Sequence, residues 1–319
     1  MFVPFRRPRG TATDMVRLGF NNMVANWPAL LLRGAESLLA AAAGLGLVAA
    51  VGLSNIDLSK FVSLIEDLVK HYTALSILVI AAAVLLIIAV AMIINAFVSA
   101  ANIRVYLDGY RAALQAMPRP PVAAFRVFRL REWIAGGRAG WWRVVQVDLV
   151  VVAISLSPAV LFLGPFLLGS HSAGSIAISC LAMFVFMITI VLGWFVSMKS
   201  EVVCIAIPEA SVRDSLHIGW SQLMDNFGIH FVTALIPTLI GLGIGIILAI
   251  AEKVTGIGGV VSWEQNITTP VAACWLMASF VALTERVLPA ETPGVVPPSY
   301  VAPPLVESTD GAPSSDTPS

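Results

Sequence analysis

The sequence has little charge for a chain of its length. Only 12% of its 319 residues are charged, whereas 58% are hydrophobic, and the mean hydropathy is +0.89. An ordinary soluble domain carries about 25% charged residues, which cover its water-facing surface. The shortage of charge therefore argues against an ordinary soluble fold and indicates that lipid surrounds much of the chain.

Sequence signals for catalysis, metal binding and nucleic-acid binding are also missing. The three cysteines, Cys180, Cys204 and Cys274, have no CxxC or Cys/His spacing, so we interpret them as small apolar core residues. The four histidines are scattered, and no HExxH, G-x-S-x-G or P-loop motif is present. The net charge of zero gives no support for a nucleic-acid partner. We therefore expect no enzymatic activity, no cofactor and no metal site.

Long apolar runs are what the sequence does have. A bilayer core about 30 Å thick requires ~20 apolar residues in a helix, and helices satisfy the backbone polar groups inside lipid. The sequence thus predicts an all-α membrane protein with six transmembrane helices and amphipathic cytoplasmic interfacial helices. The expected spans are residues 28–53, 74–100, 144–168, 174–198, 227–251 and 268–288, within one membrane domain over 1–289.

The distribution of basic residues predicts the orientation, because Lys and Arg collect in cytoplasmic segments. Fifteen of them lie before the first expected span, after the second, after the fourth or after the apolar core of the sixth, and only Lys60, Lys70 and Lys253 lie on the opposite side. This asymmetry predicts that both termini are cytoplasmic, in a multi-pass protein of the bacterial inner membrane. Residues 290–319 are rich in Pro and Ser, acidic and free of basic residues, which predicts a disordered tail.

Residues 101–143 form a basic segment in which aromatic residues alternate with arginines. Such a composition is typical of the membrane interface, and the bilayer is the partner that the sequence predicts most directly. Anionic lipids could bind this segment, although arginines beside a span are also what orientation alone requires. Unidentified membrane protein partners are a further expectation.

An internal repeat is visible at an offset of 200 residues. Each copy opens with a Ser/Thr-x-x-Asp capping pattern, continues with one apolar helical face, and ends at an Asn followed by an aromatic residue. We interpret each copy as an interfacial helix that turns into a span, although any amphipathic helix ahead of a span would look similar. A third, degenerate copy could end at residues 141–143. The matched residues are Thr11 and Ser211, Asp14 and Asp214, Gly19 and Gly219, Asn26 and Asn226.

Ionisable residues inside the expected spans are the candidates for function. They form a predicted polar layer near the cytoplasmic ends of the helices, made of Arg33, Glu36, Asp148, His230 and Glu285. We expect Arg33 to pair with Asp148 or Glu36, because an unpaired charge in lipid is costly. The layer would act either as a clamp that fixes helix packing or as a cytoplasmic-side cavity for substrate or protons, and we favour the clamp because no charge reaches the midplane.

Proline and glycine residues mark sites of kinking and close packing. Pro158 and Pro237 can kink the third and fifth spans. Gly241 and Gly245 form a small-xxx-small pattern that permits close helix approach. Transporters use such residues at binding sites, but they are common in any membrane helix.

The chain also resembles a known group of proteins. The six expected spans, the long basic second cytoplasmic loop and residues 207–226 (IPEASVRDSLHIGWSQLMDN) are similar to a loose group of uncharacterised bacterial six-span membrane proteins. That group resembles the membrane domain preceding some glycerophosphodiester phosphodiesterase domains. The likeness covers most of residues 10–289 and implies a six-span fold. The phosphodiesterase domain itself is absent, so no catalytic residues are carried over.

Two functions are compatible with these features. The first is a non-enzymatic structural, assembly or envelope-support role, which the parallel repeat and the lack of midplane charge favour. The second is a transporter or permease for a small or amphipathic solute, which the polar layer and the two prolines favour. A closed, well-packed bundle would count against transport.

Overall fold

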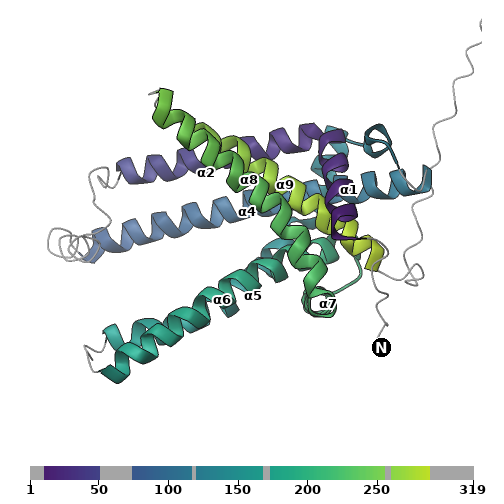
Figure 1. Cartoon of the computed structure of the whole chain (residues 1–319). Coiled ribbons are helices and arrows are strands. Elements are labelled where there is room, and N and C mark those ends of the chain that lie inside the picture. The colour runs from purple at the N-terminus through teal and green to yellow at the C-terminus, as the bar shows by residue number, and fades with distance from the viewer. Residues whose placement is uncertain (1–10, 51–73, 117–119, 168–172, 256–259, 288–319) are drawn as a thin grey trace, which may run out of the picture.

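The computed structural model describes residues 11–50, 74–116, 120–167, 173–255 and 260–287. These residues form eight α-helices and one short 3-10 helix, and they contain no strand, as the all-α prediction requires (Figure 1). The elements are α1 (Ala12–Ala25), α2 (Trp27–Ala50), α4 (Ala74–Ala116), η3 (Val122–Phe125), α5 (Leu130–Leu167), α6 (Ala173–Ala206), α7 (Val212–Asp225), α8 (Phe227–Thr255) and α9 (Val260–Val287). The predicted tail, residues 290–319, lies outside the described residues.

Four helices in the described parts of the chain are long and apolar enough to cross a membrane. They carry large apolar side chains that are more than half exposed, such as Leu85 at 66%, Phe184 at 64% and Ile247 at 66%. Lipid is the environment in which such surfaces are stable. The membrane character of the fold is therefore shown. The four apolar segments are Ala82–Leu114, Leu130–Ala159, Met183–Ala206 and Phe227–Thr255.

The long helices are arranged as three hairpins. Helix α2 packs against α4, α5 against α6, and α8 against α9. Figure 1 shows the three hairpins leaving a common packed region on the same side and then diverging. The second helices of the hairpins, α4, α6 and α9, contact one another pairwise and form the inside of that region.

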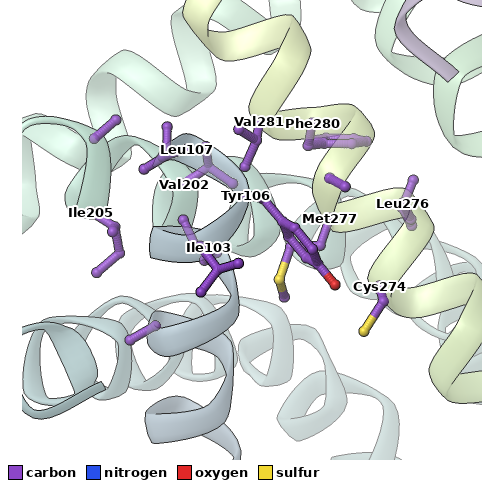
Figure 2. Close-up of a cluster of buried hydrophobic side chains, with 14 of the residues drawn as sticks. Ile103, Tyr106, Leu107, Val202, Ile205, Cys274, Leu276, Met277, Phe280 and Val281 are labelled. Carbon is purple, nitrogen blue, oxygen red and sulfur yellow. The ribbon is translucent and has the colours of Figure 1, made fainter. Parts of the chain in front are cut away.

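These three inner helices enclose a dense apolar core, which we call the central core. Ile103, Tyr106 and Leu107 of α4 meet Val202 of α6 and Phe280 of α9, and all five side chains are completely buried (Figure 2). Close packing of large side chains in the central core holds the three hairpins together.

Both predicted repeat helices are present with the predicted ends. Helix α1 has a capping box between Thr11 and Asp14, and α7 has the same box between Ser211 and Asp214. Each helix is followed by an asparagine at which the chain turns into a long helix, Asn26 before α2 and Asn226 before α8.

The two copies pack on equivalent neighbours. Gly19 of α1 lies directly on Ser279 of α9, and Gly219 of α7 lies directly on Ser200 of α6. A Cβ atom at either glycine would overlap the serine, so the absence of a side chain permits the close approach.

The expected degenerate third copy has no turn of its own. Helix α5 runs without a break from Leu130, so its first part and its apolar part are one helix. That first part packs on α4, where the Trp133 indole donates to Asn102 Oδ1 at 2.8 Å and Gly136 lies against Arg104. Helix α1, helix α7 and the first part of α5 therefore each cover the second helix of another hairpin.

Candidate functional site: the buried polar layer

The polar layer lies where the hairpins meet the central core. Arg33 of α2 forms an ion pair with Glu36 at 3.1 Å, and its Nη1 atom also donates to Asn95 Oδ1 of α4 at 2.7 Å. Of the two partners expected for Arg33, the structure shows Glu36, but this pair lies within α2 and not between helices as expected. The contact to Asn95 ties α2 to α4 in the first hairpin.

Asp148 takes part in a different contact, between α5 and α6. The Ser197 hydroxyl donates to Asp148 Oδ1 at 2.6 Å and lies 3.3 Å from Glu201 Oε1. A hydroxyl has one proton, so two hydrogen bonds at this serine require one of the two carboxyl groups to be protonated and to donate to the serine oxygen. The arrangement joins two carboxyl groups through one hydroxyl.

Glu285 and Arg286 join the C-terminal parts of α9 and α4. Arg111 binds Glu285 through two atoms, with Nη2 at 2.7 Å from Oε1 and Nε at 3.3 Å from Oε2. Arg286 Nε donates to the Tyr110 hydroxyl at 2.8 Å. Bidentate guanidinium–carboxylate pairs have a defined geometry, so this contact fixes the register of the two helices.

Arg143 stabilises the end of α6 from α5. Its guanidinium donates to the carbonyl oxygens of Cys204 at 2.6 Å and Ile207 at 3.4 Å, and also to that of Ala210. The last carbonyl groups of a helix have no partner inside the helix. Arg143 therefore supplies the donors that the α6–α7 connection needs.

Lys199 is an unusual charge among the described residues. Its side chain is fully buried, and Nζ donates to Thr284 Oγ1 of α9 at 2.7 Å. No carboxylate of the described residues lies within ion-pair distance of Nζ. A buried charge without a counter-charge is costly, so this position is a candidate for function.

His230 lies near Lys199 at the start of α8. Its Nδ1 atom lies 3.0 Å from the Asn226 carbonyl oxygen, and its ring meets the Phe280 ring edge to face at 5.7 Å between centroids. The Lys199 ammonium is close enough to act on the imidazole electrostatically. The Nε2 atom is buried and has no hydrogen-bond partner.

The predicted kink and packing residues lie in unbroken helices. Pro158 is half-buried within α5 and Pro237 is buried within α8, and both helices continue beyond the proline. Gly245 is buried, and a Cβ atom at Gly241 would lie 3.3 Å from Ala272 Cβ of α9. The small-xxx-small pattern therefore lies where α8 approaches α9, as a packing role requires.

The structure thus divides the predicted layer into separate contacts. Arg33 and Glu36 lie together, whereas Asp148, His230 and Glu285 each have other partners. Two ionisable residues of α6, the buried Lys199 and the half-buried Glu201, were missed because the fourth span was expected to end at residue 198. The sequence signal that could have found them is the group of polar residues Ser197, Lys199, Ser200 and Glu201 at the end of the fourth apolar run.

Within the described residues, no group of three or more His, Cys, Asp or Glu side chains is placed to hold a metal ion. Comparisons with known proteins add no assignment. No protein family matches the chain, and no curated protein or solved structure is detectably similar to it.

Proposed function

We propose that the chain is a six-span protein of the bacterial inner membrane that acts without catalysis, as a structural, assembly or envelope-support component. The observation that carries this proposal is the closed central core. Tyr106, Ile103 and Phe280 fill the space between the inner helices with no exposed surface. A solute would have no path along the axis between α4, α6 and α9.

The charges of the polar layer support the same function. Arg111 and Glu285 link α4 to α9, and the Arg33 contact to Asn95 links α2 to α4. Contacts of this kind fix helices relative to one another. In our proposal the layer is a clamp, which is what a scaffold for other membrane components requires.

Six spans and cytoplasmic termini are part of the proposal. Helices α2 and α9 pair with α4 and α8, so each hairpin has two helices that can cross the bilayer together. The arginines of the α4–α5 region lie at the end of the molecule that holds the central core, opposite the diverging hairpin tips (Figure 1). The positive-inside rule then places this end in the cytoplasm. We also propose that the chain, through residues 207–226, is similar to the six-span membrane domain that precedes some glycerophosphodiester phosphodiesterase domains.

A transporter or permease is the second candidate. The observation in its favour is the half-buried pair of carboxyl groups, Asp148 and Glu201, joined through Ser197. Acidic side chains within spans are used as proton relays in transporters.

One pair of experiments separates the two functions. The full-length protein is reconstituted into proteoliposomes and tested with a panel of solutes and a proton gradient, and the gene is depleted in its bacterial host. If the protein is a scaffold, the proteoliposomes should show no solute flux that depends on the protein. Depleted cells should then take up a membrane-impermeant dye and lose other membrane complexes. A solute flux that Asp148→Asn abolishes while the protein stays folded would replace the scaffold by the transporter.

Topology is tested separately with reporter tags. Tags after residue 10, in residues 117–119 and after residue 287 are expected to report the cytoplasm, and tags in residues 51–73 the opposite side. Opposite compartments for the two ends of the chain would contradict the proposed orientation.

A further inference from the structure

Buried polar atoms without a partner gather around α7. Among the described residues, six residues have buried side-chain nitrogen or oxygen atoms without a hydrogen-bond partner, and five of them belong to α6, α7 or α8. All five are completely buried. Native proteins leave few such groups, so a concentration of them requires an explanation. Together with Lys199 they form what we call the α7 polar cluster: Lys199, Ser200, Ser215, Gln222, His230 and Thr233.

The cluster carries an uncompensated positive charge. Within the described residues, Lys199 Nζ donates a hydrogen bond to the Thr284 hydroxyl alone, which leaves ammonium protons for other acceptors. Thr284 in turn donates to the Phe280 carbonyl at 2.7 Å, and the Phe280 ring contacts His230. The lysine and the histidine are therefore parts of one connected site between α6, α8 and α9.

The cluster offers several donors. The Lys199 ammonium and the Gln222 amide nitrogen donate only, and the Ser200, Ser215 and Thr233 hydroxyls can each donate one proton and also accept. His230 Nδ1 faces the Asn226 carbonyl and must carry the proton, so Nε2 accepts in the neutral ring, as Gln222 Oε1 does, and donates only when the ring takes up a second proton. A negatively charged ligand with several acceptor oxygens, such as a phosphate group, would pair with the ammonium, satisfy the hydroxyls and the amide nitrogen, and favour protonation of His230.

The repeat provides an internal control. In the first copy the positions of Ser215 and His230 are occupied by Met15 and Leu30, which pack as apolar residues. The position of Gln222 is occupied by Asn22, whose amide donates to the Tyr106 carbonyl at 2.7 Å and whose Oδ1 accepts from Asn26 at 2.9 Å. The same helix–turn–helix geometry therefore accommodates apolar residues at the positions of Ser215 and His230.

We propose that the α7 polar cluster binds the phosphate group of an anionic lipid at the cytoplasmic face of the membrane. The cluster lies at the start of the apolar helix α8, and the outer face of α7 exposes Trp220 and Met224, side chains suited to the lipid interface. Because the cluster is closed to solvent, binding requires α7 to move away from Ser200. A headgroup and free phosphate offer the same chemistry, and the experiment separates these two sources.

The test uses full-length protein in nanodiscs of phosphatidylcholine, with or without phosphatidylglycerol, and delipidated protein in neutral detergent with inorganic phosphate. Lipid retention is measured by native mass spectrometry and stability by the thermal unfolding midpoint. The variants are Lys199→Met and His230→Leu, the second of which introduces the first-copy residue. Lys253→Met is the control, because Lys253 is exposed near the other end of α8 and its loss changes the net charge equally.

Wild-type protein and the control are expected to retain phosphatidylglycerol and to be stabilised by it. Both cluster variants should bind it about tenfold more weakly or worse, since each loses a hydrogen bond to a charged group. Without an anion Lys199→Met should be more stable than wild type, because an unpaired buried charge is removed, and phosphatidylglycerol should reverse this order.

The outcomes separate the lipid from its alternatives. Stabilisation by inorganic phosphate and not by phosphatidylglycerol would overturn the lipid and assign the cluster to a free anion. Equal lipid retention by wild type, Lys199→Met and His230→Leu would overturn the site altogether. If Lys199→Met does not fold, His230→Leu decides, because leucine is already accommodated at the equivalent position of the first copy.

Discussion

Replacing Asn26 by alanine is expected to destabilise the protein much more than replacing Asn226, its counterpart in the repeat. Asn26 Oδ1 accepts from the backbone nitrogens of Val127 at 3.1 Å and Phe128 at 3.0 Å, and its amide donates to the Phe125 carbonyl at 2.8 Å. Alanine would leave two backbone N–H groups and one carbonyl group without a partner, at roughly 1–3 kcal/mol each.

Water recovers part of this loss, because Val127 and Phe128 are only half-buried. We therefore expect Asn26→Ala to lower the free energy of unfolding by about 2–4 kcal/mol. Within the described residues, the Asn226 side chain makes one long hydrogen bond, 3.5 Å from its amide nitrogen to the Gln222 carbonyl, so Asn226→Ala should cost about 0.5 kcal/mol or less.

The assay is unfolding of both variants in mixed detergent micelles, followed by tryptophan fluorescence, with the monodisperse fraction after heating as a second measure. The two substitutions remove the same atoms at equivalent turns, so they control for the loss of the side chain itself. Equal destabilisation would refute the reasoning, because the structure gives the two turns different partners.

Three other predictions follow from local geometry. Gly19→Ala places a Cβ atom 2.5 Å from the Ser279 backbone nitrogen and should cost about 1–3 kcal/mol in thermal unfolding, whereas Gly34→Ala meets nothing within 4 Å and should stabilise by up to about 1 kcal/mol. Glu285→Gln leaves Arg111 without its carboxylate and should cost about 1–3 kcal/mol, which a double-mutant cycle with Arg111→Gln measures; additive losses would exclude coupling. The Ser211 hydroxyl and backbone N–H lower the pKa of Asp214 below its ordinary 3.8, so its capping contribution is fully present above that value and is lost as pH falls through the lower folded pKa. In wild type, α7 should therefore lose protection from hydrogen exchange as the pH falls through the folded pKa of Asp214. Asp214→Asn should abolish this pH-dependent loss of protection.

Much of the local structure was predictable because its causes lie within a few residues. The capping boxes of α1 and α7 join residues three positions apart, so the sequence pattern contains both partners.

The buried charges were less predictable because their partners are distant in the sequence. A hydropathy argument ends the fourth span at the first charge, but α6 continues to Ala206 with Lys199 and Glu201 inside the packed region. Thr284, the partner of Lys199, is 85 residues away, and no local sequence pattern predicts this contact. The same holds for Arg111, whose partner Glu285 is 174 residues away.

The most distant contacts also decide how the three hairpins form one body. Helix α1 begins the chain's described part, yet it packs on α9, where the Trp275 indole donates to the Val16 carbonyl at 2.8 Å and its ring meets Phe20. Helix α7 packs in the same way on α6, and the start of α5 on α4. The first helix of each unit therefore covers the second helix of another unit, so the three units close a ring. The hairpins, which diverge away from their common packed region (Figure 1), are therefore held together at the central core.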